Sequence, residues 1–104
     1  MPAFAVTMEQ GPGWAQGSDL AGQPYFREHV GYVQDLASRG VIIIGGPVDT
    51  GDDGDVAMLA VEAADPAAAR AAFADDPWTV HGVFQVKSTW PWNLTLRSPA
   101  RTPS

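Results

Sequence analysis

Two histidines are the side chains of this sequence best suited to proton transfer. His29 lies beside Phe26, Val30 and Val33, which recur at helical spacing, so it belongs to the apolar face of a predicted helix. Such a histidine is either a hydrogen-bonded part of the core or a pocket residue that exchanges protons near neutral pH. From the residue types alone, the core interpretation of His29 is favoured. His81 is the other histidine, and the sequence assigns it no role.

Several other chemistries are excluded by what the sequence lacks. There is no cysteine, hence no thiolate nucleophile, no disulfide and no cysteine-ligated zinc. No serine stands in a nucleophile-elbow pattern, and the spacing of a phosphate-binding loop is missing. Asp49, Asp52, Asp53 and Asp55 lack the spacing and closing glutamate of an EF-hand, and predict a solvated turn. One histidine near two aspartates supplies too few metal ligands, so we expect no metal site.

Asp75 and Asp76 stand directly before Pro77 and Trp78. An Asp-Pro pair is common where a turn ends a helix, which is one interpretation of Asp76. The other is a carboxylate that orients a histidine and favours its protonated form or its correct tautomer. The sequence leaves open whether Asp75 or Asp76 would face the histidine. Trp78 has two interpretations, a side chain packed in the core or an interface and an apolar wall of a pocket, and the first is slightly favoured.

Four more residues are candidates for substrate binding. Gly45 and Gly46 either let a ligand approach the backbone closely or form a bulge or strand end. Arg27 would bind an anionic group of a substrate, although a plain surface charge is favoured. Tyr32 comes three residues after His29, within reach of the same helix face.

The elements that must position these residues follow from hydrophobic period and chain breakers. A buried strand is predicted over Ala3–Met8, followed by a glycine-rich loop over Glu9–Gly22. Trp14 within that loop is interpreted as a cap on the core in preference to a cover over a pocket. The helix that carries His29 is predicted over Pro24–Arg39, with proline in its first turn and Gly40 as its C-terminal cap.

The second half of the domain is predicted as two strands, a helix and a last strand. Asp65-Pro66 starts the helix, with an aspartate N-cap and proline in the first position. The continuous β-branched run Val41–Ile44 predicts that the first of these strands is buried on both faces. The predicted ranges are Gly40–Val48, Val56–Ala63, Ala67–Ala74 and Val80–Trp90. The order is that of an α+β, ferredoxin-like βαββαβ domain with an antiparallel sheet, and two bare sheet faces packed together would give a dimeric α/β-barrel.

Length and charge limit the number of domains and the kinds of binding partner. The 104 residues suit one domain, predicted over residues 1–92, with a flexible tail over 93–104. The net charge of −6 and the lack of a basic patch argue against nucleic acid and anionic membrane surfaces. The longest apolar run, Val41–Ile44, is too short to span a membrane, and Met1–Thr7 does not resemble a secretory signal. We therefore expect a cytoplasmic protein.

Four segments in order resemble one known family. They are Arg27-Glu28-His29-Val30, Gly40–Pro47, Asp76-Pro77-Trp78 and His81–Phe84, and together they resemble the YCII-related domain over roughly Pro2 to Trp90. The resemblance implies a ferredoxin-like homodimer with a pocket near the interface, no bound cofactor, and His29 and Asp76 as the proposed catalytic pair. One branch of that family eliminates chloride from a chlorinated hydroxyquinol, and other relatives act in biosynthetic pathways. This chain departs from the family in its loop at Glu9–Gly22 and its Trp90-Pro91-Trp92 ending.

Two hypotheses of function follow from the residues and the resemblance. The first is a cofactor-independent enzyme of the lyase or isomerase kind, dehydrochlorinase-like or cyclase-like. In it His29 and Asp76 transfer a proton on an aromatic or polyketide-like metabolite, by elimination, isomerisation or cyclisation. The second is a non-catalytic dimer that binds a small molecule or serves as an accessory protein. A purely structural interaction module is a third, and it predicts no ligand-sized pocket around His29.

Overall fold

Seven helices and strands follow one another in residues 1–96, the part of the chain that the computed structural model describes. The strands form a single four-stranded sheet in the order β2-β3-β1-β4, and every neighbouring pair is antiparallel. In chain order the elements are β1 (Ala3–Gln10), α1 (Phe26–Ser38), β2 (Ile42–Pro47), β3 (Asp55–Glu62), α2 (Pro66–Ala71), α3 (Pro77–Val80) and β4 (Phe84–Pro91).

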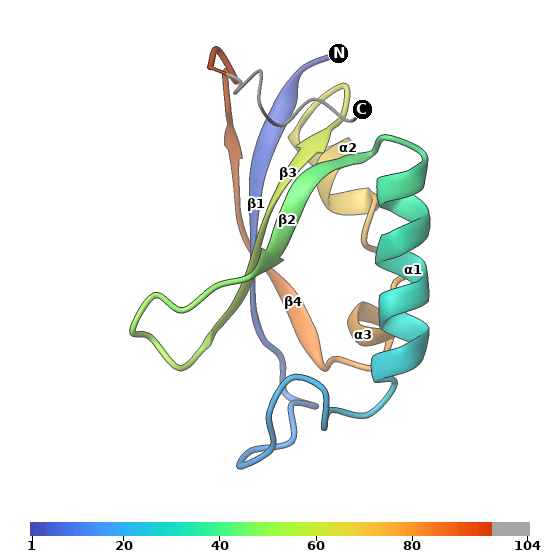
Figure 1. Ribbon diagram of the computed structural model, residues 1–104, viewed down its shortest axis with the longest axis vertical. Helices are drawn as coiled ribbons and strands as arrows, with labels where there is room; N and C mark the ends of the chain where they lie inside the picture. The colour runs from blue at the N-terminus through green and yellow to red at the C-terminus, as the bar shows by residue number, and fades with distance from the viewer. Residues whose placement is uncertain (97–104) are drawn as a thin grey trace, which may run out of the picture.

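The helices lie on one face of the sheet, with α1 running alongside it and α2 and α3 behind (Figure 1). Strand order and helix placement are those of the ferredoxin-like α+β fold, so the predicted fold class is confirmed. The other face of the sheet carries no helix in the described part of the chain. The dimeric assembly and the 1–92 domain boundary stay predictions, and most of the predicted tail lies outside the described residues.

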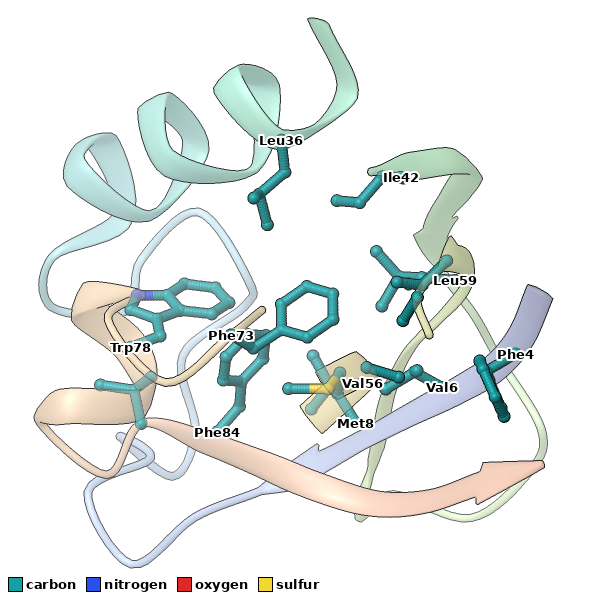
Figure 2. Close-up of a cluster of buried hydrophobic side chains, with 14 residues drawn as sticks. Phe4, Val6, Met8, Leu36, Ile42, Val56, Leu59, Phe73, Trp78 and Phe84 are labelled. Atoms are coloured by element: carbon teal, nitrogen blue, oxygen red, sulfur yellow. The ribbon is translucent and has the colours of Figure 1, made fainter. Parts of the chain in front are cut away.

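The core fills the space between the sheet and the helices. Phe4, Val6 and Met8 alternate along β1 and point to the helix side, as the two-residue period of a strand requires (Figure 2). Phe73 and Trp78 pack onto them from the segment between β3 and β4. Burial of one side chain of this size contributes about 1.5–3 kcal/mol, so this layer fixes how the helices sit on the sheet.

The last strand begins at Phe84, not at Val80 as predicted. Val80 is instead the final residue of α3, a one-turn helix that the sequence prediction missed. Asp76 caps α3 by accepting a hydrogen bond from the Trp78 amide, and Pro77 occupies the first helical position. Gly82, with φ +68°, then turns the chain into β4. The Asp-Pro pair that was expected to end a helix therefore starts one.

The helix α1 begins at Phe26, two residues after Pro24, whose predicted place in the first turn is wrong. Tyr25 precedes the helix with φ 61°, the only non-glycine residue with positive φ among those described. The predicted C-terminal cap is confirmed, because Gly40 has φ +76° and its amide donates to the carbonyl of Ala37.

The strand β2 lies at the edge of the sheet and is not buried on both faces as predicted. It pairs with β3 only, and Ile44 is 69% exposed. The predicted turn over the acidic residues is confirmed, since Asp49 and Asp52 accept hydrogen bonds from the amides of Gly51 and Gly54. No helix in residues 1–96 is long and apolar enough to cross a membrane. The cytoplasmic location stays a prediction.

Candidate active site

His29 and Asp76 are hydrogen-bonded to each other. The imidazole Nδ1 lies 3.0 Å from Oδ1 and 2.9 Å from Oδ2 of the carboxylate. His29 comes from the first turns of α1, and Asp76 from the residue just before α3. The side chain of Asp76 has no solvent exposure, and that of His29 is 12% exposed. An ionised carboxylate only accepts hydrogen bonds, so Nδ1 carries the proton in this pair.

The position of Asp76 is fixed by its role as a helix cap. Its Oδ1 also accepts the amide hydrogen of Trp78 at 2.9 Å, which ties the carboxylate to the backbone of α3. Asp75 is exposed, and no hydrogen bond joins its side chain to His29. The choice between Asp75 and Asp76 that the sequence left open is therefore settled in favour of Asp76.

Trp78 holds the imidazole from one face. The two rings are parallel, with centroids 3.8 Å apart and an interplanar angle of 2°. Phe84 meets the same imidazole edge-on at 5.1 Å. Trp78 itself is fully buried, and its indole N–H donates to the carbonyl of Pro24 at 2.7 Å, just before α1 begins. The orientation of His29 is thus set by the Asp76 carboxylate at Nδ1 and by the Trp78 and Phe84 rings that pack against the imidazole.

A cavity of about 350 Å³ opens between α1 and the sheet, and His29 lies in its wall. The helix contributes one side of it through Phe26, His29, Val30, Val33, Gln34 and Ala37. Phe26, Val30 and Val33 among them belong to the apolar face that the sequence predicts, with His29 beside it. Of the α1 residues only Leu36 is buried.

The sheet supplies the opposite wall, which is apolar. It is formed by Ile42, Gly45, Gly46 and Pro47 of β2, Val56, Ala57 and Leu59 of β3, and Phe84 of β4. Phe73, Trp78 and Leu20 complete the lining. The only side chains with hydrogen-bonding groups in the whole lining are His29, Gln34 and the indole of Trp78, whose N–H is already used.

The second ring nitrogen of His29, Nε2, is available to a ligand. It makes no hydrogen bond to any described residue, and it is not among the buried polar atoms that lack a partner. Nε2 therefore reaches accessible space while Nδ1 is occupied. With the proton on Nδ1, Nε2 carries a lone pair and is a hydrogen-bond acceptor and a base.

The other predicted binding residues are placed unequally around the cavity. Gly45, Gly46 and Trp78 line it, whereas Arg27 is exposed and outside the lining. A Cβ on Gly45 would lie 3.0 Å from the Leu59 side chain and from the Met58 carbonyl oxygen, so strand packing leaves little room for a side chain there.

Tyr32 serves the structure next to the site. Its hydroxyl donates to the carbonyl of Ala72 at 2.7 Å, which ties α1 to the end of α2, and it is not part of the cavity lining. Burial, followed by the nearby charges of Asp75 and Asp76, raises the pKa of this phenol above its ordinary value. His81 lies outside the cavity too, stacked on Tyr25 with ring centroids 3.8 Å apart.

Sequence reasoning missed Leu20, Gln34 and Phe84 as lining residues. Gln34 is four residues after Val30, so its helical spacing was a usable signal. Leu20 and Phe84 come from a loop and from a strand whose start was misplaced, so no local pattern identified them. Trp14, expected to cap the core, does pack against it and meets Trp78 edge-on at 6.0 Å.

No group of three His, Cys, Asp or Glu side chains in residues 1–96 is arranged to hold a metal ion.

A model of the family described as the YCII-related domain matches residues 7–93. None of the curated proteins matches the chain. The matched segment includes both His29 and Asp76 and every residue of the cavity lining.

Proposed function

The chain belongs to the YCII-related domain family, and from the geometry of His29 and Asp76 we propose that it is a cofactor-independent enzyme that transfers protons on an aromatic or polyketide-like metabolite. The reaction is an elimination, an isomerisation or a cyclisation. The observation that carries the proposal is a histidine in the wall of an apolar cavity, with its Nδ1 held by a buried carboxylate and its Nε2 making no hydrogen bond to any residue of 1–96.

In the proposed step, Nε2 of His29 removes a proton from a carbon or hydroxyl group of the bound molecule. The imidazole becomes an imidazolium, and the adjacent carboxylate of Asp76, 2.9 Å from Nδ1, compensates its charge. The electron pair left on the substrate then moves into a carbonyl, a ring or a leaving group. Returning the proton to another atom of the substrate completes an isomerisation, and loss of an anion completes an elimination.

The lining favours an uncharged substrate. Among residues 1–96, no lysine or arginine contributes to the cavity, and the walls that these residues form are apolar apart from His29 and Gln34. The pair of His29 and ionised Asp76 carries a charge of zero when the imidazole is protonated and minus one when it is not. An anionic substrate would thus meet no net positive charge in either state, and its desolvation would not be offset. The exposed Arg27 is accordingly not part of the proposed site.

Deuterium exchange into a neutral ketone tests this proposal directly. 2-Tetralone is a bicyclic ketone with acidic C–H groups beside its carbonyl, and it is small enough for the cavity. In D₂O, the protein is expected to accelerate the loss of those C–H signals in ¹H NMR by about 10²–10⁴-fold over buffer, the usual contribution of a positioned general base. His29→Gln is expected to return the rate to that of buffer.

His81→Gln is the matched control, because His81 is an exposed histidine outside the cavity. It is expected to exchange like the wild type. Full activity in His29→Gln would exclude His29 as the base. The second candidate function, non-catalytic binding of a small molecule, is favoured instead if 2-tetralone shifts the NMR signals of the lining residues and yet gains no deuterium.

We also propose that two copies associate through the uncovered face of the sheet. One cross-strand row on that face is apolar throughout and runs Ile44, Ala60, Ala5 and Trp90 across the four strands. Ile44 and Trp90 are 69% and 62% exposed. A second copy would cover this row, as the family resemblance implies.

A further inference from the structure

The loop between β1 and α1, residues 11–25, contributes to the wall of the cavity. Leu20 is the residue of this loop in the cavity lining. The loop lies at the end of the molecule where α1 begins (Figure 1), and His29 is the fourth residue of α1. Leu20 thus lines the same cavity as His29.

Gln23 gives this loop a fixed shape. Its side chain is almost fully buried, at 4% exposure. Its Nε2 donates to the carbonyls of Ala15, Ser18 and Asp19 at 3.0, 3.3 and 3.2 Å, and its Oε1 accepts the amide hydrogen of Ala15 at 2.7 Å. One side chain thus satisfies both polar groups of its own amide within the loop, and the loop is organised before any ligand binds.

The loop is also fastened to the candidate active site. The amide of Gly11 donates to the carbonyl of Val83 at 2.9 Å. A Cβ at Gly11 would lie 2.2 Å from the carbonyl oxygen of Gly82, so only glycine permits this approach. Trp14 meets Trp78 edge-on, and Trp78 is the ring stacked on His29. These contacts describe a preformed wall and not a lid.

We propose that Leu20 is a specificity-determining residue of this site, positioned by Gln23, and that it limits the size of a neutral ring system at the His29 end of the cavity. The proposal rests on the proposed function for the identity of the site. It goes further by assigning selectivity to a residue of the loop between β1 and α1. Leu20 would touch the ligand, whereas Gln23 would act only through the loop.

The test compares the affinities of two neutral ketones of different size, 2-tetralone and the tricyclic anthrone, by NMR titration of the lining residues. Leu20→Ala is expected to raise the affinity for anthrone relative to 2-tetralone at least about tenfold, since even a single methylene in an apolar pocket changes selectivity by that order. Leu20→Phe is expected to move the ratio in the opposite direction. Gln16→Ala, an exposed position in the same loop, is the control and is expected to leave the ratio unchanged.

Gln23→Met tests the positioning role, because it keeps the side-chain size and removes the four hydrogen bonds. In Gln23→Met the affinity for anthrone relative to 2-tetralone is expected to rise, as in Leu20→Ala, and hydrogen exchange at the Ala15 amide is expected to be faster. An unchanged ratio in both Leu20 variants, or an equal shift in Gln16→Ala, would overturn the proposal. These affinities do not depend on turnover, so failure of the deuterium exchange with an altered binding ratio would reject only the proposed reaction.

Discussion

His29 owes its candidate role to neighbours far away in the sequence. Its face is covered by Trp78 and its Nδ1 is held by Asp76, 47 residues further along the chain. The sequence identified both residues, and it favoured a core histidine until the family resemblance was considered. Both descriptions hold in part, because the ring is packed like a core side chain and His29 still lies in the wall of the cavity.

Removing the imidazole should destabilise the protein, since Asp76 would be left as a buried carboxylate without its main partner. His29→Ala is expected to lower the free energy of unfolding by about 3–5 kcal/mol, the usual cost of breaking a buried pair. His29→Gln, whose amide can still donate to Asp76, is expected to cost clearly less. Urea unfolding curves of the two variants measure this difference, and equal losses would show that the hydrogen bond to Asp76 contributes little.

Tyr32 should make the protein sensitive to alkaline pH. Burial and the nearby aspartates raise the pKa of its phenol in the folded state. A raised pKa means that the folded state holds the proton more tightly than the unfolded chain, so this contribution to stability is full below about pH 10 and is lost as pH rises through the folded-state value.

The measurement is the free energy of unfolding between neutral pH and about pH 11.5, a range that brackets an ordinary tyrosine. Tyr32→Phe is expected to flatten the alkaline decline, while Tyr25→Phe, which changes the exposed second tyrosine, is expected to decline like the wild type. A parallel decline in Tyr32→Phe and the wild type would assign the alkaline loss to other groups.

At the scale of elements, the same dipeptide marks two helix starts. Asp65-Pro66 was predicted to begin a helix and does, with Asp65 accepting the Ala68 amide at 2.7 Å. Asp76-Pro77 begins α3 by the same chemistry, although the sequence was interpreted as a helix end followed by a strand. The alanine-rich segment before Asp76-Pro77 favoured interpreting the pair as a helix end. The helix α3 has only four residues, which is too short to show a hydrophobic period. The core strands, by contrast, were predictable from their alternation.

These two caps should differ in their energetic weight. Asp65→Ala removes an exposed cap and is expected to cost about 1 kcal/mol. Asp76→Ala removes a cap and also leaves the imidazole of His29 without its carboxylate, so its cost should be larger. Thermal unfolding of both variants measures the difference. If the two melted alike, the bond between Asp76 and His29 would have no role in holding α1 to α3.

At the scale of the whole molecule, the sheet order could be predicted because the alternation of strands and helices permits few topologies. The cavity could not be predicted, since it exists where the apolar stripe of α1 fails to reach the sheet. Its lining combines residues from Leu20 to Phe84, and no local pattern records that meeting. The edge position of β2 could not be predicted either, because a run of three isoleucines is compatible with a central strand and with an edge strand.

The proposed homodimer is tested at this scale. Trp90→Glu places a charge in the apolar row of the open sheet face and is expected to yield a monomer in sedimentation equilibrium. Val80→Glu is the matched control, since Val80 is equally exposed at 62% and lies in α3 on the helix side of the sheet. A wild-type protein that is monomeric at all concentrations would contradict the proposal, as would dissociation of Val80→Glu alone.

The central claim is that Asp76 fixes the proton of His29 on Nδ1 and so leaves Nε2 as the base. The most direct measurement is the ¹⁵N NMR spectrum of the two ring nitrogens at about pH 9, where ordinary imidazoles are neutral, in the wild type and in Asp76→Asn. In the variant, the amide oxygen can keep the cap on Trp78 while the amide N–H points at Nδ1. We expect the proton on Nδ1 in the wild type and on Nε2 in Asp76→Asn, with the signals of His81 unchanged. A wild-type ring protonated on Nε2, or the same tautomer in both proteins, would contradict the account.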